Sequence, residues 1–175
     1  MEDVKIKVLF DQEALNKRIS ELADELYEIY KDEEVVFVCV LKGSVFFTCE
    51  LMKKYKGDAR INFLRVSSYE GTESTGKINL KLPLKEENIK DRHVLIVEDI
   101  VDTGYTLEFL REYVKGMNPK SLRECTLLNK LSRRIVPITP EFIGFDIPDL
   151  FVIGYGLDYD EKYRNLPYIG VVSNE

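Results

Sequence analysis

The sequence predicts an α/β fold with a mainly parallel central sheet flanked by helices. Short apolar runs rich in β-branched residues alternate along the chain with segments of helical periodicity, which is the pattern of strand–helix–strand units. Two of these runs, 35–41 and 94–97, are continuously apolar, as strands are when helices cover both faces of a sheet. At 175 residues, the chain is expected to form a single domain, 1–175, with one sizeable core.

Composition and charge exclude several classes of protein. With 45% hydrophobic and 32% charged residues the chain is globular in type, and its net charge of -6 argues against broad nucleic-acid binding. No apolar run approaches the roughly 20 residues of a membrane helix, and the charged first residues lack the core of a signal peptide. The cysteines all lie in predicted core elements and are expected to be reduced and buried, in a cytoplasmic protein. They are Cys39, Cys49 and Cys125.

The first part of the chain is predicted to contain two helices and three strands. A helix follows Asp11, a plausible N-cap, and its apolar residues recur at spacings of three and four. These residues are Leu15, Ile19, Leu22, Leu26 and Ile29. The strand at 35–41 leads through Lys42-Gly43-Ser44 into a second helix. A more exposed strand is expected at 59–66, and a returning strand at 78–82. The apolar face of the second helix comprises Val45, Phe46, Phe47, Leu51 and Met52.

The segment 67–77 between the latter two strands is rich in glycine, serine and threonine and is predicted to be a flexible loop. Two interpretations are open. Loop statistics alone favour a long hairpin connection, whereas a glycine-containing loop of this length also suits an active-site lid.

The second part of the chain begins with the central strand, whose first residue, His93, is expected to be structural. A helix with Leu107, Leu110 and Val114 on its apolar face ends at Gly116. Strands are predicted at 122–128, 142–145, 151–155 and 169–172, with an irregular basic stretch at 129–141.

Three acidic residues directly after the central strand suggest chemistry. Glu98, Asp99 and Asp102 offer hard oxygen ligands for a divalent metal and acceptors for sugar hydroxyls. Because side chains alternate along a strand, Glu98 and Asp99 are expected to point to opposite sides. Asp102 lies where the chain turns, a place that suits an acid or base.

The turn that follows offers a phosphate site. Thr103, Gly104 and Thr106, with the backbone amides of a helix N-terminus, form a nest for an anion. The alternative is that the acids merely cap the helix and balance its dipole, but three acids within five residues exceed what capping requires. The stretch therefore predicts a site for a phosphorylated sugar and a metal beyond the carboxyl ends of parallel strands.

The stretch 94–106 resembles the signature of the type I phosphoribosyltransferases, which bind 5-phosphoribosyl-1-pyrophosphate. Four further stretches, in the family's order, make the chain similar to the hypoxanthine/guanine phosphoribosyltransferases in their short bacterial form. They are Leu-Lys-Gly-Ser at 41–44, Ser-Ser-Tyr at 67–69, Lys130 with the following Ser-Arg-Arg, and Phe-Val-Ile-Gly-Tyr-Gly-Leu-Asp-Tyr at 151–159. The resemblance covers about 35–172 and implies the type I fold, with a small hood formed by the chain ends.

The resemblance implies roles for the residues around the sugar. Glu98 and Asp99 would contact the ribose hydroxyls, partly through Mg²⁺, and Asp102 would be the general base or acid facing N7 of the purine. The 5′-phosphate would be wrapped by the segment from Asp102 through Tyr105 to Thr106. The pyrophosphate would be bound by Lys42, Gly43 and Arg164, and the Leu41-Lys42 bond is often cis in the family.

On the purine side, the resemblance implies that Lys130 donates to the 6-oxo group, Phe151 stacks on the ring, and Val152 binds the base edge through its backbone. Asp158 would hold a second Mg²⁺, mostly through water. Ser68 and Tyr69 would belong to a loop that closes over the site. An ammonium beside the ring oxygen selects a 6-oxopurine over adenine. Taken singly, such residues would be surface charges, core aromatics or turn residues, and their joint order carries the prediction.

The implied enzyme converts hypoxanthine, and guanine, with 5-phosphoribosyl-1-pyrophosphate to IMP (GMP) and pyrophosphate, using Mg²⁺, in purine salvage. Alternatives are a guanine- or xanthine-preferring transferase, and a regulator that senses 5-phosphoribosyl-1-pyrophosphate and binds nucleic acid. Members of the family form homodimers or homotetramers. The chain departs from the family pattern at Tyr105, at Leu131 in place of a frequent proline, and at Asn129 in place of a frequent aspartate.

Overall fold

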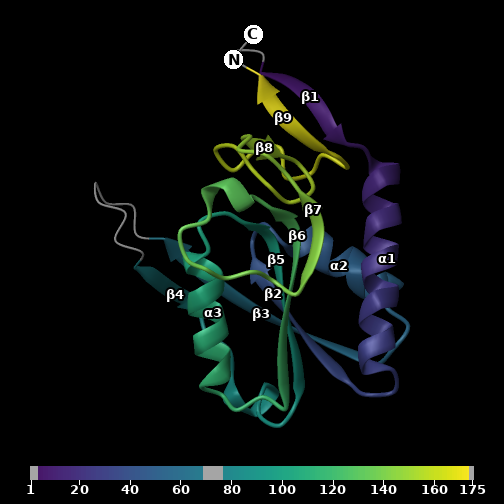
Figure 1. The fold of residues 1–175 in the computed structure, drawn as a ribbon, viewed down its shortest axis with the longest axis vertical. Coiled ribbons are helices and arrows are strands. Elements are labelled where there is room, and N and C mark those ends of the chain that lie inside the picture. Colours follow the sequence, from purple (N-terminus) through teal and green to yellow (C-terminus); the bar gives the residue numbers. More distant parts are fainter. Residues whose placement is uncertain (1–3, 69–76, 174–175) are drawn as a thin grey trace.

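The computed structural model describes residues 4–68 and 77–173 and shows a central sheet between helices, with a smaller sheet at one end (Figure 1). The elements in chain order are β1 (Lys5–Phe10), α1 (Gln12–Tyr30), β2 (Val35–Leu41), α2 (Val45–Lys54), β3 (Ala59–Ser68), β4 (Ile78–Leu82), η1 (Glu86–Asn88), β5 (His93–Val101), α3 (Tyr105–Lys115), β6 (Ser121–Asn129), η2 (Leu131–Arg133), β7 (Phe142–Asp146), β8 (Val152–Ile153) and β9 (Ile169–Ser173).

The central sheet has six strands in the order β4-β3-β2-β5-β6-β7. All neighbours are parallel except β4, which pairs antiparallel with β3 at one edge. The predicted mainly parallel sheet is therefore confirmed. From β2 the chain continues outward to β3, whereas from β5 it continues in the other direction to β6 and β7. The strand order thus reverses between β2 and β5, and ligands of open α/β sheets bind beside such a reversal.

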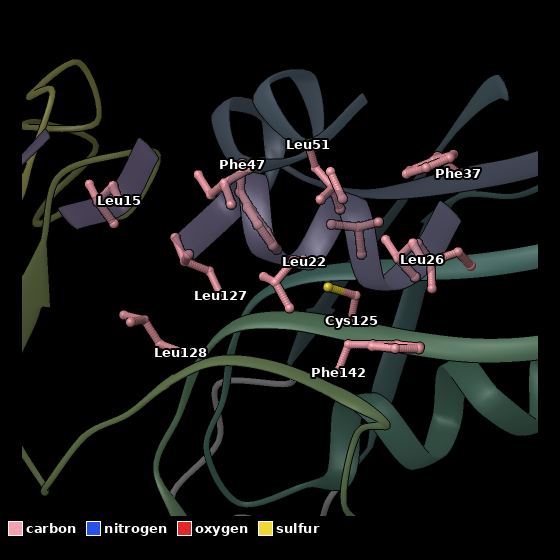
Figure 2. Close-up of a cluster of buried hydrophobic side chains, with 14 of the residues drawn as sticks. Leu15, Leu22, Leu26, Phe37, Phe47, Leu51, Cys125, Leu127, Leu128 and Phe142 are labelled. Carbon is pink, nitrogen blue, oxygen red and sulfur yellow. The ribbon is translucent and has the colours of Figure 1, made fainter. Parts of the chain in front are cut away.

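Helices cover both faces of this sheet. The larger core cluster joins α1 and α2 to one face, and Figure 2 shows Leu22 and Leu26 of α1 near Cys125 and Leu127 of β6. On the other face, Leu110 and Val114 of α3 belong to a second cluster with the alternate residues of β2 and β5. Every residue of β2 except its last is buried, as expected of a strand covered on both sides.

The smaller sheet is built from both ends of the chain, in the order β1-β9-β8 (Figure 1). It corresponds to the hood expected from the resemblance. The local sequence did not lead to a prediction of β1, because the antiparallel partner of β1 is β9, at the opposite end of the chain.

Several strand boundaries differ from the prediction, and β5 continues past the predicted end at Val97 to Val101. β3 continues to Ser68, within the predicted loop, because Ser67 and Ser68 pair with Asn79 and Ile78 of β4. The predicted strand at 151–155 is reduced to β8, because the backbone turns to positive φ after Ile153, 93° at Gly154 and 51° at Tyr155.

The buried faces of the helices also differ in part from the prediction. Cys39 and Cys125 are buried, but Cys49 is exposed, so the prediction of a buried thiol was wrong there. Cys49 lies about 200° around α2 from the fully buried Phe47, which faces the sheet. Ile29 and Phe46 were assigned to buried faces but are 44% and 43% exposed.

Within the described residues, none of the helices has the length and apolarity that a membrane crossing requires.

Candidate active site

A cavity of about 310 Å³ opens where β2 and β5 separate. The two strands are in register as far as Cys39 and Val97. Beyond this point β2 follows β3 to Leu41 and β5 follows β6 to Val101, so their carboxyl ends diverge. The cavity therefore lies at the reversal of strand order.

Most of the sugar and phosphate residues predicted from the sequence line this cavity together. They are Gly43, Glu98, Asp99, Asp102, Thr103, Gly104 and Thr106. Tyr105 is not among the lining residues. Its half-buried ring packs against a small apolar cluster that includes Leu107 and Ile138.

The two neighbouring acids, Glu98 and Asp99, both line the cavity and interact with each other. The pKa of Glu98 is well above its ordinary value, mainly because the group is buried and secondly because of the charge of Asp99. Burial also raises the pKa of Asp99, although the Oδ1 atom of Asp99 accepts a hydrogen bond of 2.7 Å from the Ile100 amide. The expectation that the two side chains point to opposite sides was wrong, because the side chains interact with each other where β5 has left its register with β2.

Gly43 provides the space for one of these acids. A Cβ atom at Gly43 would lie 1.7 Å from Asp99 Oδ2, so a side chain at position 43 is incompatible with the observed carboxylate. One residue earlier in the same loop, the Leu41–Lys42 peptide bond is cis, as the resemblance implies.

The acid pair fits a divalent cation, because a cation would offset the repulsion between the buried carboxylate of Glu98 and the partly buried carboxylate of Asp99. In residues 4–68 and 77–173, no three Asp, Glu, His or Cys side chains form a ready-made metal cluster. Mg²⁺ commonly uses one or two carboxylates together with substrate oxygens, so two acids are sufficient. Asp158 is engaged elsewhere, with Oδ1 3.2 Å from Arg164 and Oδ2 accepting from the Glu161 amide at 2.9 Å.

The turn between β5 and α3 is fixed by backbone contacts. Gly104 has a φ of 96°, which brings the chain directly into α3 and leaves the first amides of the helix without partners in the helix. The amides of Ile135 and Val136 both donate to the Thr103 carbonyl, at 2.9 and 3.0 Å. Arg134 Nε donates to the Asp102 carbonyl at 3.1 Å. The turn therefore presents preorganised donors to an anion.

Asp102 has a partner that the sequence did not indicate. Its Oδ1 accepts a hydrogen bond of 3.0 Å from Arg133 Nε, and the same guanidinium lies 3.5 Å from Asp149. The available signal was the basic stretch at 129–141, but local sequence does not indicate which acid an arginine will meet.

Of the predicted purine residues, Lys130 contacts the end of β5, just before this turn. Lys130 is only 8% exposed, its amide donates to the Val101 carbonyl at 2.9 Å, and its Nζ lies 3.8 Å from Asp149. Phe151 is 53% exposed and meets Tyr159 edge to face. Val152 is buried in β8. Lys130 is thus no solvated surface lysine, and Phe151 is no core aromatic.

The predicted pyrophosphate residues, Lys42 and Arg164, are joined by a residue that was not predicted. Lys42 Nζ lies 2.6 Å from one carboxylate oxygen of Glu161, and Arg164 lies 3.1 Å from the other. Hydrogen bonds from Lys42 and Arg164 hold the pKa of Glu161 below its ordinary value. Ser68 ends β3, whereas Tyr69 and most of the predicted loop 67–77 lie outside the described residues.

Comparison with known proteins identifies the family of the chain. A family model for the phosphoribosyl transferase domain matches residues 5–160. The chain is 42% identical to a hypoxanthine-guanine-xanthine phosphoribosyltransferase of Tritrichomonas foetus, over 98% of this chain and 93% of the relative. It is 44% identical to a hypoxanthine phosphoribosyltransferase of Escherichia coli, over 95% of each chain.

Among solved structures, it superposes on a hypoxanthine-guanine phosphoribosyltransferase of Bacillus anthracis with a TM-score of 0.92 and 44% identity, covering 98% of this chain and 100% of the other. A family match over most of the chain, relatives above 40% identity and a shared fold all lead to one assignment. The chain belongs to the phosphoribosyltransferase family and, within it, to the hypoxanthine/guanine phosphoribosyltransferases.

Proposed function

We propose that the protein is a Mg²⁺-dependent 6-oxopurine phosphoribosyltransferase of purine salvage. It transfers the phosphoribosyl group of 5-phosphoribosyl-1-pyrophosphate to hypoxanthine, and to guanine, and releases pyrophosphate. The observation that carries this proposal is the cavity itself, which is lined at the reversal of strand order both by the acid pair and by the turn at the N-terminus of α3. The names of the relatives support the choice of purine base.

In this proposal, the turn from Asp102 to Thr106 holds the 5′-phosphate through backbone amides and threonine hydroxyls. Glu98 and Asp99 accept hydrogen bonds from the two ribose hydroxyls and would hold Mg²⁺ together with substrate oxygens. When bound, Mg²⁺ supplies positive charge that stabilises the departing pyrophosphate. Tyr105 supports the turn from the apolar side and leaves the contact with phosphate to the backbone.

Asp102 acts as the general acid or base at N7 of the purine. In the substrate-free protein its carboxylate contacts Arg133, with both side chains substantially exposed, 39% and 49%. An ion pair of this exposure is weak, so the carboxylate can exchange Arg133 for a purine nitrogen at little cost.

The purine half of the site selects a 6-oxo group. The nearly buried ammonium of Lys130 donates a hydrogen bond to the 6-oxo group of the base. Adenine carries an amino group at this position, which is also a donor, so adenine would place two donors against each other. Phe151, which is exposed in the free protein, offers a face on which the base stacks. Val152 contributes its backbone to the base edge, and Asp158 would hold a second Mg²⁺ mostly through water.

The choice of base is tested by comparing kcat/KM for hypoxanthine, guanine and xanthine in saturating 5-phosphoribosyl-1-pyrophosphate and Mg²⁺. We expect nucleotide formation from hypoxanthine, and loss of activity when the metal is chelated. A preference for xanthine is the specific rival, because the name of the Tritrichomonas relative includes that base. Turnover of hypoxanthine near background would contradict the proposal.

A regulator that binds nucleic acid is the rival from another class. The net charge of -6 disfavours it. A salt-sensitive shift of RNA or DNA by the protein, without nucleotide formation, would establish it instead.

We also infer that the chain functions as one catalytic domain, in the cytoplasm, as a homodimer or homotetramer. The support for self-association is apolar surface. Ile61 and Phe63 lie on the same face of β3 and are 37% and 42% exposed, and Phe46 of α2 is 43% exposed. Light scattering coupled to size exclusion measures the assembly directly, and a monomer at micromolar concentration would contradict this inference.

A further inference from the structure

We propose that Glu161 is a built-in counterion of the pyrophosphate site, which occupies Lys42 and Arg164 in the free enzyme and is displaced by pyrophosphate. This inference rests on the proposed function, because that function assigns Lys42 and Arg164 to the pyrophosphate. Its consequence is that Glu161 determines how tightly pyrophosphate is held and how readily it leaves.

The carboxylate of Glu161 spans the two cations with one oxygen each. Oε2 lies 2.6 Å from Lys42 Nζ, and Oε1 lies 3.1 Å from an Arg164 guanidinium nitrogen. An anion with several oxygens bridges a lysine and an arginine in the same manner. The side chains of Lys42 and Glu161 are 44% and 65% exposed, so a ligand from solvent can reach the contact.

The two cations depend on Glu161 to different degrees. Arg164 is also anchored by its hydrogen bond to the Gly156 carbonyl at 2.7 Å and by Asp158 at 3.2 Å. For Lys42, Glu161 is the sole ion-pair partner within residues 4–68 and 77–173. Displacement of Glu161 therefore frees Lys42 fully, while Arg164 stays in place to receive an anion.

The backbone holds Glu161 at this position. Asp160 and Glu161 are the two central residues of a tight turn in which Tyr159 and Lys162 exchange hydrogen bonds of 3.1 and 3.0 Å. Both central residues have positive φ, 51° and 62°, a conformation that favours glycine or asparagine. The turn fixes the backbone, whereas the exposed side chain of Glu161 keeps rotational freedom and can swing away.

Charge decides the direction of the effect. Pyrophosphate with its several negative charges cannot share Lys42 with a carboxylate without repulsion, so binding includes the loss of the two Glu161 contacts. Conversely, the return of Glu161 to Lys42 favours departure of the product. Release of product limits turnover in many enzymes, so such a competitor affects kcat as well as affinity.

The test compares Glu161→Gln with Asp160→Asn in the full chain. Both substitutions remove one negative charge from the same turn, but Asp160 forms no ion pair in the described part of the chain and serves as the matched control. Titration calorimetry with inorganic pyrophosphate and excess Mg²⁺ measures the affinity. From the usual worth of exposed ion pairs we expect Glu161→Gln to bind pyrophosphate roughly fivefold more tightly than wild type, and the control to stay within about twofold. The gain should shrink at high salt.

Steady-state kinetics give a second readout. Glu161→Gln should lower the KM for 5-phosphoribosyl-1-pyrophosphate, whereas a residue that only orders Lys42 and Arg164 would raise it. Weaker pyrophosphate binding by Glu161→Gln, or equal changes in both variants, would overturn the role of Glu161. A wild-type chain that neither binds pyrophosphate nor forms nucleotide would instead overturn the proposed function, so the two failures are distinguishable.

Discussion

Replacing Gly43 with alanine tests whether Asp99 and the loop after β2 are as tightly packed as the structure shows. The new Cβ atom would lie 1.7 Å from Asp99 Oδ2 and 2.7 Å from Asp99 Cγ. Ordinary contact begins at 3.4 Å, so the carboxylate would have to retreat by about 1.7 Å. The loop cannot easily move instead, because the Gly43 carbonyl already packs closely against Gly156.

The magnitude follows from the required displacement. A misplacement of about 1 Å in a reacting assembly costs on the order of 100-fold in rate, so we expect kcat/KM to fall by about 100-fold or more in Gly43→Ala. Overpacking of this kind typically also lowers the free energy of unfolding by about 1–3 kcal/mol.

The assay measures nucleotide formation over a range of Mg²⁺ and 5-phosphoribosyl-1-pyrophosphate concentrations, with urea unfolding in parallel. Gly116→Ala is the matched control, because its Cβ atom would meet nothing closer than the Tyr113 carbonyl at 3.5 Å. Its φ of -62° is also ordinary for alanine. A Gly43→Ala enzyme within about threefold of the Gly116→Ala control would refute the close packing of Gly43 on Asp99 and the reasoning built on it.

Three further predictions concern single groups. Asp102→Asn should lower kcat by about 100- to 10,000-fold while binding of Mg-5-phosphoribosyl-1-pyrophosphate is retained, and preserved kcat would contradict the acid/base role. Asp11→Ala should lower the free energy of unfolding by about 1 kcal/mol in urea titrations, because the N-cap accepts a 2.8 Å hydrogen bond from the Ala14 amide; an unchanged midpoint would argue against the cap. Burial and then Lys120 lower the pKa of His93 from 6.5, so its imidazole NMR signals, the sole histidine signals of the chain, should titrate below that value. Because the unfolded chain binds this proton more readily, the free energy of unfolding should fall as the pH drops from about 6.5 through the pKa of folded His93. A pKa of His93 above 6.5 would contradict this prediction.

Much of the fold was predictable because it depends on neighbours in sequence. The uninterrupted apolar run of β2 indicates burial on both faces, and the spacing of apolar residues in α1 defines a helix capped by Asp11. The errors occurred where distant segments decide the outcome. β1 depends on β9, the end of β3 depends on β4, and the exposure of Cys49 depends on which side of α2 meets the sheet.

The candidate site divides in the same way. The acids, the turn and the start of α3 are consecutive in sequence, so their order indicated a sugar-phosphate site directly. The contact between Lys42 and Glu161 joins residues 119 positions apart, and that between Asp102 and Arg133 joins residues 31 positions apart. No local pattern reveals such pairs, because the partner of an exposed charge depends on how loops are brought together.

The sequence by itself determined the type of fold and the family to which the chain belongs, and it predicted which segment carries the chemistry. These properties depend on local periodicity and on the order of short motifs, and both are visible in the sequence alone. The tertiary structure decided that Glu98 and Asp99 meet instead of pointing apart, that Gly43 makes room for one of them, and that Glu161 contacts both Lys42 and Arg164. The physical reason is that these contacts arise where β2 and β5 diverge and where the turn at Glu161 meets the loop at Lys42, and both arrangements depend on the packing of the whole chain.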